Sequence, residues 1–376
     1  MRQLGWKGVW MTSKIGVDVR MWDHPGIGRY LRELVTALSA SGARQAFCFL
    51  GFGRTREALA RVFPNAKFEE SSSRIYGLHE QEELWRFSRK VDLLHVPHFN
   101  APLFLSSKLI VTVHDLIYLK DTRYSGSFLG KLYARVLFQG LARNADAVIA
   151  VSRFTMNDLI QAFPKLEGRV EVIHEAASAH FRQSPDPKAL RAVRDRLGLS
   201  SPFILFVGSF KAHKNLPVLL DAFQGIKKKN GLAHELVLVG KKDPKEKELL
   251  RRLANLPHVT CLENLEDESL FALYHLAEVL VAPSLWEGFG LPVLEAMACG
   301  TPVICSDRSS LPEVAGDAAL TFDPERADCL EELLVRILQD NDLRQKLSAK
   351  GLERSSRFSW ENAAQETVKL YEKVLG

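Results

Sequence analysis

The segment VLVAPSLWEGFGLPVLEAMA, residues 279–298, contains an apolar run, a glycine-rich turn and a helical pattern in direct succession. The run VLVA is typical of a buried parallel strand, and Pro292 suits the first turn of the helix that LPVLEAMA predicts. The turn exposes backbone N–H groups at the helix N-terminus, where phosphate or carboxylate oxygens bind. Glu287 on the turn and Glu295 on the helix would flank such a ligand. An ordinary strand–helix connection with two solvated glutamates is the alternative.

Strand and helix patterns alternate along the rest of the chain, which predicts two doubly wound α/β domains with parallel sheets. The polar, proline-containing stretch 178–188 predicts the linker between them. We place the N-terminal domain at 1–182, the C-terminal domain at 183–358 and a last helix at 359–376. Strands are expected at 15–20, 46–51, 92–96, 108–114, 145–151, 169–173, 203–208, 235–240, 258–262, 279–282, 302–306 and 319–322. Helices are expected after the glycine turn at 26–28 and at 54–63, 78–89, 127–143, 153–162, 215–229, 245–253, 268–275, 326–339, 343–354 and 359–375.

The composition is that of an ordinary globular protein, with 46% hydrophobic and 25% charged residues. Five cysteines without paired metal-binding spacing predict reduced thiols in a cytoplasmic chain. No apolar stretch reaches the roughly 18 residues that predict a membrane span. The N-terminus also lacks the apolar core of a signal peptide. A cytoplasmic location is therefore expected.

Positive charge is concentrated in the first half of the chain. Residues 1–180 contain 24 Lys and Arg against 17 Asp and Glu, whereas the rest contains 26 against 28. This asymmetry predicts attraction to an anionic surface, such as the headgroups on the inner face of a membrane or a lipid-diphosphate substrate. Solubility alone is the alternative explanation. Nucleic acid is not an expected partner, because no basic-aromatic module or binding motif is present.

Two groups in the N-terminal half follow predicted strands, and parallel sheets bind ligands at the carboxyl ends of their strands. His114 and Asp115 come directly after the β-branched run KLIVTV, so they are well placed to contact a substrate. Capping of the next segment is the alternative role of Asp115. Gly26 and Gly28 follow the first strand, in a turn that either lets a ligand approach the backbone or forms only a tight corner.

The C-terminal half carries cations at a strand end. Lys211, His213 and Lys214 lie between the strand FILFVG and a helix, so they can bind phosphate oxygens together with the helix N-terminus. The loop 306–314 follows another strand and can form part of the ligand wall. No Walker pattern is present, which argues against ordinary ATPase chemistry. No spacing of His and Asp predicts a metal site.

Several motifs together resemble glycosyltransferase family 4, whose members are retaining enzymes of the GT-B fold that use nucleotide-diphosphate sugars. The resembling segments are GIGRY (26–30), TVHDL (112–116), VGSFKAHKNL (207–216), SLWEGFGLPVLEAMACGTPVICSDRSSLPEVAGDAA (284–319) and FSW (358–360). The resemblance extends from about residue 14 to the end of the chain. It implies two Rossmann-like domains that face a central cleft. The N-terminal domain would bind the acceptor, the C-terminal domain would bind the nucleotide sugar, and the last helix would cross back to the N-terminal domain.

The resemblance also implies roles for individual residues. Glu287 would contact the donor sugar, Lys214 would bind its phosphates, and His114 would lie at the reacting centre, where it orients sugar hydroxyls or stabilises positive charge through its carbonyl. The implied donor-binding positions are Gly28, Ser209, Lys214, Glu295 for the ribose hydroxyls, and the amides of Phe289, Gly290 and Leu291. Many members have an arginine where this chain has Ser209, so phosphate neutralisation would depend more heavily on Lys214.

The implied reaction is sugar transfer with retained anomeric configuration and without a metal ion or other cofactor. The motifs GIGRY, TVHDL and HKNL resemble those of bacterial mannosyltransferases of polysaccharide assembly. This implies GDP-mannose as donor and a glycan, lipid-linked or lipopolysaccharide-type, as acceptor at the inner membrane face. A sugar-nucleotide epimerase on the same fold and a non-catalytic sugar-nucleotide-binding protein are the alternatives.

Overall fold

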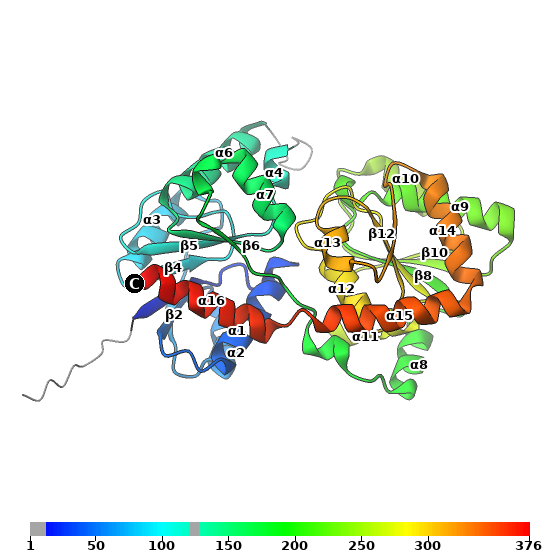
Figure 1. Cartoon of the computed structure of the whole chain (residues 1–376), viewed down its shortest axis with the longest axis horizontal. Helices are drawn as coiled ribbons and strands as arrows, with labels where there is room; N and C mark the ends of the chain where they lie inside the picture. Colours follow the sequence, from blue (N-terminus) through cyan, green and yellow to red (C-terminus); the bar gives the residue numbers. More distant parts are fainter. Residues whose placement is uncertain (1–12, 121–127) are drawn as a thin grey trace, which may run out of the picture.

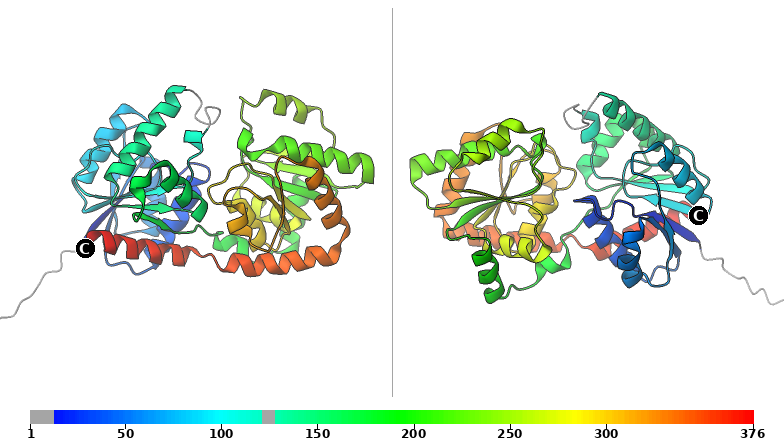
Figure 2. Two further views of the ribbon diagram at one scale, coloured as in Figure 1. Left: turned by 45° about the horizontal axis from the view of Figure 1, so that its top comes forward. Right: turned by 180° about the vertical axis from the view of Figure 1, so that it is seen from behind.

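The computed structural model describes residues 13–120 and 128–376, and it contains two parallel β-sheets, each covered by helices on both faces (Figures 1 and 2). The N-terminal sheet has the strand order β3-β2-β1-β4-β5-β6-β7. Its strands are β1 (Lys14–Asp18), β2 (Ala46–Gly51), β3 (Lys67–Glu70), β4 (Leu93–Val96), β5 (Lys108–Val113), β6 (Ala147–Ala150) and β7 (Val170–Val172). The central strands β4 and β6 are buried throughout because helices cover both of their faces.

Amphipathic helices bury their apolar sides on this sheet. Leucines of α1 pack on one face, and apolar residues of α3, α6 and α7 pack on the other. The helices of this domain are α1 (Ile27–Ala40), α2 (Arg56–Val62), α3 (Leu78–Ser88), α4 (Ile117–Lys120), α6 (Phe128–Asn144) and α7 (Arg153–Ala162). Ser152 caps α7 as its sequence predicts, since its hydroxyl accepts a hydrogen bond from the N–H of Thr155 at 3.0 Å.

The C-terminal sheet has the strand order β10-β9-β8-β11-β12-β13. Its strands are β8 (Phe203–Val207), β9 (Glu235–Val239), β10 (Val259–Leu262), β11 (Val279–Ala282), β12 (Val303–Ser306) and β13 (Leu320–Phe322). Its helices are α8 (Pro187–Arg196), α9 (Leu216–Asn230), α10 (Lys247–Ala254), α11 (Asp267–Leu276), α12 (Leu291–Ala298), α13 (Leu311–Ala315), α14 (Ala327–Gln339) and α15 (Asn341–Ser356). Helices α9, α10 and α14 pack on one face, and α11 and α12 pack on the other.

The last helix, α16 (Trp360–Leu375), leaves the C-terminal domain and packs against α1 and β5 of the N-terminal domain (red in Figure 1). Tyr371 anchors it, because its hydroxyl lies 2.7 Å from His95 Nδ1 in the N-terminal core. One apolar core runs through both domains and includes Phe181, Phe289 and Trp360 near the crossing. The two doubly wound domains and the crossing helix confirm the fold that the sequence predicts.

Some local expectations were wrong. The edge strand β3 was not predicted, because its sequence KFEE lacks an apolar run. The stretch 178–188 lies between the two sheets and has structure of its own: it contains the 3₁₀ turn Ala179–Arg182, and α8 begins at Pro187, where Asp186 caps it by accepting from the N–H of Lys188 at 2.9 Å. Short helices α4 and α13 were also missed. The helix expected at 127–143 is α6, and Ser127 lies outside the described residues.

All five cysteines are free thiols. Within the described part of the chain, none of the helices has the length and apolar character needed to cross a membrane. The predicted domain boundary at 182 falls between the two sheets, at the end of the 3₁₀ turn that precedes α8.

Candidate active site

A lysine and a glutamate form an ion pair at the carboxyl end of the C-terminal sheet. Lys214 ends a 3₁₀ turn after β8, and Glu287 lies on the turn after the adjacent strand β11. Lys214 Nζ is 2.5 Å from Glu287 Oε1, and both side chains are mostly buried. Burial raises the pKa of Glu287, but the charge and hydrogen bond of Lys214 outweigh it and hold the pKa below its ordinary value. Two predicted site residues are therefore in contact, with the carboxylate ionised.

Asn215 fixes the position of this lysine. It has a left-handed backbone, with φ of 54°, which ends the 3₁₀ turn and starts α9. Its side-chain amide donates to the carbonyl oxygens of Pro283, at 3.2 Å, and Pro324, at 2.7 Å. The loop after β8 is therefore tied directly to the loop after β11, which brings Lys214 and Glu287 together.

Three serines hold the turn that carries Glu287. The hydroxyl of Ser284 donates to Glu287 Oε1 at 2.8 Å, and that of Ser309 accepts from the Glu287 N–H at 3.1 Å. The hydroxyl of Ser310 donates to the carbonyl oxygen of Phe289 at 2.8 Å. Ser309 and Ser310 come from the loop 306–314, so this loop supports the glutamate turn from behind.

The N-terminus of α12 presents unoccupied backbone donors beside this ion pair. No described residue accepts a hydrogen bond from the N–H groups of Phe289, Gly290 or Leu291. Gly290 has a φ of 104°, and a Cβ there would lie 2.6 Å from Leu311, so the turn requires glycine. Free N–H groups with the positive end of a helix form a site for phosphate oxygens.

Ser209 and Lys214 lie on the same loop and close together. A Cβ on Gly208 would be 3.6 Å from Cδ and Cε of Lys214, so the lysine stem runs along the backbone next to Ser209. Burial, assisted by the charge of Lys214, lowers the pKa of His213 to about 3, so its ring is neutral. Lys211 is exposed. Lys214 is therefore the cation of this loop that contacts Glu287.

His114 is placed at the end of β5 by two acceptors. Its Nδ1 is 3.0 Å from Glu175 Oε1, and its Nε2 is 3.1 Å from the carbonyl oxygen of Pro97. Burial lowers the pKa of His114, but the hydrogen bond and charge of Glu175 outweigh it, so the pKa lies above its ordinary value. Both ring nitrogens face oxygen acceptors, and an imidazolium ion satisfies both. In this arrangement the ring has no lone pair with which to remove a proton.

The carbonyl oxygen of His114 lies at the interface between the domains. It accepts from the hydroxyl of Thr155 at 3.1 Å and packs against Gly288 of the glutamate turn. The hydroxyl of Ser152 donates to the Gly288 carbonyl at 2.6 Å. The neighbouring Asp115 accepts from the N–H of Ile117 at 2.9 Å, which is the capping role weighed as the alternative to substrate contact.

Gly28 is needed by the chain's own backbone. A Cβ at this position would lie 2.9 Å from the carbonyl carbon of Trp22 and closer to its oxygen. The tight corner thus accounts for this glycine without a ligand, and its proposed contact with the donor stays a prediction. The corner also directs Arg29, the second residue of the Gly28-Arg29-Tyr30 run, toward the C-terminal domain.

Arg29 of α1 forms an ion pair with Glu295 of α12, across the two domains. Glu295 is only 2% exposed, and its other oxygen accepts from the hydroxyl of Tyr274 at 2.7 Å. Arg29 also contacts Asp267 at 2.7 Å. The carboxylate that would hold the ribose hydroxyls therefore already has two donors, one of them from the opposite domain.

Glu313 makes a second link between the domains. Its carboxylate accepts from the N–H groups of Arg153 and Phe154, at 3.0 and 3.3 Å, and so caps α7 of the opposite domain. It also lies 2.8 Å from Nε2 of His174. Burial raises the pKa of Glu313, but these donors outweigh it and lower the pKa. The structure is therefore a closed state in which several polar contacts join the domains.

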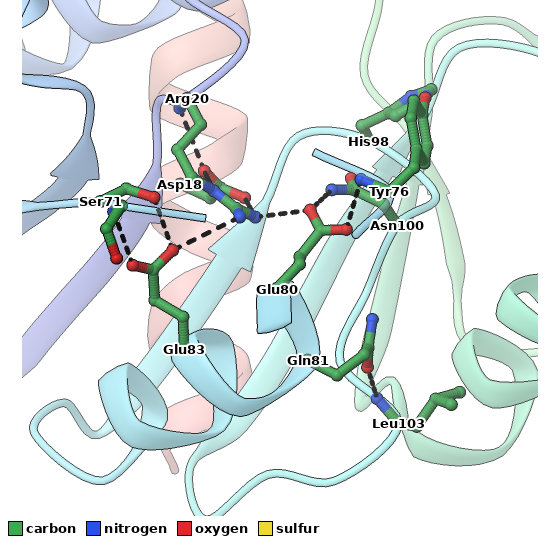
Figure 3. A network of polar contacts seen from close by, with 11 residues as sticks. Asp18, Arg20, Ser71, Tyr76, Glu80, Gln81, Glu83, His98, Asn100 and Leu103 are labelled. Carbon is green, nitrogen blue, oxygen red and sulfur yellow. Dashed lines mark hydrogen bonds and ion pairs between the residues drawn. The ribbon is translucent and has the colours of Figure 1, made fainter. Parts of the chain in front are cut away.

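A buried polar network forms the carboxyl edge of the N-terminal sheet (Figure 3). Arg20 pairs with Asp18 at 2.6 Å and with Glu80 at 3.0 Å, and all three are almost fully buried. Glu80 also accepts from the N–H of Tyr76 at 2.7 Å and holds it in a left-handed conformation with φ of 65°. The phenol of Tyr76 in turn contacts His98. The network therefore fixes the rings of Tyr76 and His98 beside the carboxyl edge of this sheet.

Within residues 13–120 and 128–376, no three His, Cys, Asp or Glu side chains are grouped so that they could hold a metal ion. The prediction that the reaction needs no metal remains a prediction.

Two family models together cover most of the chain. The model for glycosyl transferases group 1 matches residues 193–354, and that for glycosyltransferase family 4 matches residues 25–178. The O-antigen chain mannosyltransferase B of Escherichia coli is 30% identical, over 78% of this chain and 78% of that protein. This chain belongs to glycosyltransferase family 4. The serotype-specific mannosyltransferase WbdA of Escherichia coli is also 29% identical to this glycosyltransferase. The match covers 74% of this chain but only 35% of the longer WbdA protein.

The fold of this glycosyltransferase is also that of solved enzymes. The structure of Anabaena Alr3699/HepE in complex with UDP-glucose matches with a TM-score of 0.78, over 96% of this chain and 100% of that one, at 19% identity. This likeness confirms the GT-B arrangement that the sequence predicts.

The glycosyltransferase brings most of its predicted site residues together. Lys214, Glu287 and the free amides of α12 share one end of the C-terminal sheet, with Ser209 alongside, and His114 faces the glutamate turn through Gly288. Glu295 instead lies in the contact with Arg29. Sequence analysis missed Arg29 and Glu175. The position of Arg29 in the GIGRY motif, directly after Gly28, was an available signal, whereas Glu175 gave none.

Proposed function

We propose that this glycosyltransferase transfers mannose from GDP-mannose to a hydroxyl of a glycan or lipid-linked acceptor, with retention and without a metal ion. The observation that carries the proposal is the contact of Lys214 with Glu287 beside three free backbone amides. In a nucleotide-diphosphate sugar, the hydroxyl-rich ring is joined directly to the phosphates. The site has a matching arrangement: the carboxylate of Glu287 can bind the sugar hydroxyls, and the adjacent Lys214 and backbone amides can bind the phosphate oxygens.

In the proposed mechanism, the bond between the anomeric carbon and the diphosphate oxygen breaks while the bond to the acceptor oxygen forms on the same face. Lys214 and the amides of Gly290 and Leu291 stabilise the charge that develops on the diphosphate. The released phosphate oxygen takes the proton of the acceptor hydroxyl. Glu287 accepts hydrogen bonds from the donor sugar, since its lowered pKa keeps it ionised.

His114 acts in this scheme as a positioned cation and not as a base. Its ring is held by Glu175 and Pro97, and its raised pKa favours the protonated form. A cation close to the glutamate turn favours charge on the leaving diphosphate. Closure of the domains through Gly288 excludes water from the donor and limits its hydrolysis.

Glu295 would anchor the ribose hydroxyls of the nucleotide. In the closed structure its carboxylate is paired with Arg29, so the ribose must either displace the guanidinium or share the carboxylate with it. The loop of Lys214 and the turn of Glu287 do not depend on this exchange. Replacement of Glu295 is therefore expected to weaken donor binding more than it slows turnover.

The donor and pathway are proposed from the relatives. Both Escherichia coli relatives are named mannosyltransferases, and the first acts on the O-antigen chain by its name. This supports mannose as the sugar, and GDP-mannose as the donor, in polysaccharide or lipopolysaccharide biosynthesis. A lipid-linked acceptor, together with the basic N-terminal half, supports a cytoplasmic enzyme that works at the inner face of the membrane.

A panel of nucleotide sugars tests the proposal. The enzyme is incubated with GDP-mannose, UDP-glucose and related donors, with and without a mannose-containing acceptor, and the released nucleotide is measured. We expect release from GDP-mannose that depends on the acceptor, and a product with the α-configuration of the donor. Release without acceptor, accompanied by an isomerised sugar, would indicate an epimerase. Binding without any release would indicate a non-catalytic sugar-nucleotide-binding protein.

A further inference from the structure

Exposed apolar side chains are concentrated on one part of the surface. Nine large hydrophobic residues of the described chain are exposed, and most of these belong to α6 or to the loop beside it. They are Phe104, Phe128 and Leu129, each 74% exposed, Leu132 at 50% and Val136 at 41%. Contiguous exposed apolar patches of this kind mark interaction sites in soluble proteins.

Helix α6 has two apolar sides, only one of which packs on its own domain. Leu137, Phe138 and Leu141 are buried against the N-terminal sheet. Phe128, Leu132 and Val136 recur every four residues, so they lie along the opposite, outward side. This helix runs on the outside of the N-terminal domain, next to α4 (Figures 1 and 2). The outward apolar side thus lies outside the hydrophobic core formed by the described residues.

The loop that carries Phe104 is held against the same helix. Its neighbour Leu103 packs on Gly140, and the carbonyl oxygen of Leu103 accepts from the side-chain amide of Asn144 at 2.8 Å. The N–H of Leu103 also donates to Gln81 at 2.8 Å, as seen in Figure 3. Phe104 therefore projects from a fixed loop and extends the exposed apolar surface.

The charges of α6 have one sign. The helix contains Lys131, Arg135 and Arg143 but no aspartate or glutamate, and Arg135 and Arg143 are exposed. Basic side chains beside exposed Phe and Leu are the pattern of a helix that lies in the interface of an anionic bilayer. The surface of an ordinary protein partner carries charges of both signs, so it would not complement a helix whose charges are all positive.

The apolar end of α6 lies on the side of the active site. Its first turns adjoin α4, where Lys131 Nζ is 3.4 Å from the carbonyl oxygen of Lys120. Lys120 in turn lies over the ring of Trp286, at 5.2 Å, and Trp286 precedes the catalytic Glu287. A surface that receives Phe128 and Leu129 would therefore lie beside the mouth of the donor and acceptor site.

We propose that the α6 surface, formed by Phe128, Leu129, Lys131, Leu132 and Arg135, docks on an anionic phospholipid bilayer. Docking places the site so that a lipid-linked acceptor can enter it while its lipid stays in the membrane. The choice of acceptor rests on the proposed function, but the docking itself does not. The headgroups supply the negative charge, and the acyl boundary receives the apolar side chains.

The test uses the full chain with vesicles of phosphatidylcholine alone or of equal parts phosphatidylcholine and phosphatidylglycerol. Flotation measures the bound fraction at low and at high salt. We expect binding to the anionic vesicles that is about tenfold stronger than to neutral ones and that weakens with salt. The double variant Leu129→Ser/Leu132→Ser should lose about tenfold in binding. Failure of the parent protein to bind anionic vesicles would overturn the proposal.

Leu352→Ser is the matched control, since Leu352 is 48% exposed on α15 of the other domain. It should bind as the parent does, and an equal loss in this variant would contradict docking through α6. Thermal unfolding and transfer to a water-soluble acceptor should be unchanged in the double variant. If light scattering shows that the double variant separates a dimer, a second copy of the chain is the occupant and the proposal is wrong. Vesicle binding without sugar transfer would refute the proposed function and leave the docking in place.

Discussion

Replacement of Gly288 with alanine tests whether the closed contact between the domains belongs to the catalytic cycle. A Cβ there would lie 2.7 Å from the carbonyl carbon of His114 and closer still to its oxygen, where real Cβ contacts stay above 3.0 Å. The obstacle is backbone, so the domains must move apart. A displacement of about 1 Å between reacting groups costs about 100-fold in rate, which corresponds to about 2.7 kcal/mol in activation free energy. We therefore expect kcat to fall by about 100-fold.

Backbone strain at position 288 should not contribute to this effect. Gly288 is not among the residues with positive φ, so alanine can adopt its backbone conformation. The assay measures kcat for acceptor-dependent nucleotide release, together with the midpoint of thermal unfolding. Gly53→Ala is the control, because a Cβ there meets only the flexible carboxylate of Glu70, at 2.6 Å. If Gly288→Ala keeps kcat within about twofold of the parent, the closed contact is not part of the reacting geometry.

Three further predictions concern charged pairs. The raised pKa of His114 means that its pairing with Glu175 stabilises the fold fully below about pH 6.5 and less as pH rises through the folded pKa; Glu175→Gln should therefore lower the unfolding midpoint more at pH 6 than at pH 9, and an equal loss at both would refute the pairing. Arg29→Met should lower the free energy of unfolding by about 2 kcal/mol, because Glu295 stays buried without its cation. In denaturant titrations, the double variant Arg29→Met/Glu295→Gln should recover most of the lost stability. A double variant that is no more stable than Arg29→Met would contradict this. Glu287→Gln should chiefly lower kcat, whereas Glu295→Gln should chiefly raise the donor KM by about tenfold; the reverse pattern in steady-state kinetics would exchange their roles.

The glutamate turn could be predicted from the sequence because its determinants are local. The apolar strand, the glycines and Pro292 lie within 20 residues of each other, and they recur in the structure as β11, the turn and α12. The meeting of Lys214 with Glu287 also follows from simple rules. Both residues end neighbouring parallel strands, and such ends share one edge of a sheet.

The contacts across the domains could not be predicted in the same way. Arg29 and Glu295 are 266 positions apart, and neither residue has a local pattern that identifies its partner. The cap of α7 by Glu313 and the Arg20–Glu80 pair have the same character. Sequence analysis missed β3 and α8 for a different reason. Strand β3 is a polar edge strand without an apolar run, and α8 is short, has no fully buried residue and has only Leu190 and Val193 as larger apolar residues.

The rate of mannose transfer by Lys214→Ala tests the central claim most directly. Lys214 is in contact with Glu287, whereas Lys241, just after β9, is exposed and serves as the matched control. With GDP-mannose and a mannose-containing acceptor, we expect Lys214→Ala to lower kcat/KM by about 100- to 1000-fold, the usual cost of a lost donor to a developing negative charge. Lys241→Ala should stay within about twofold of the parent. Equal transfer rates in both variants would contradict the assignment of the donor site.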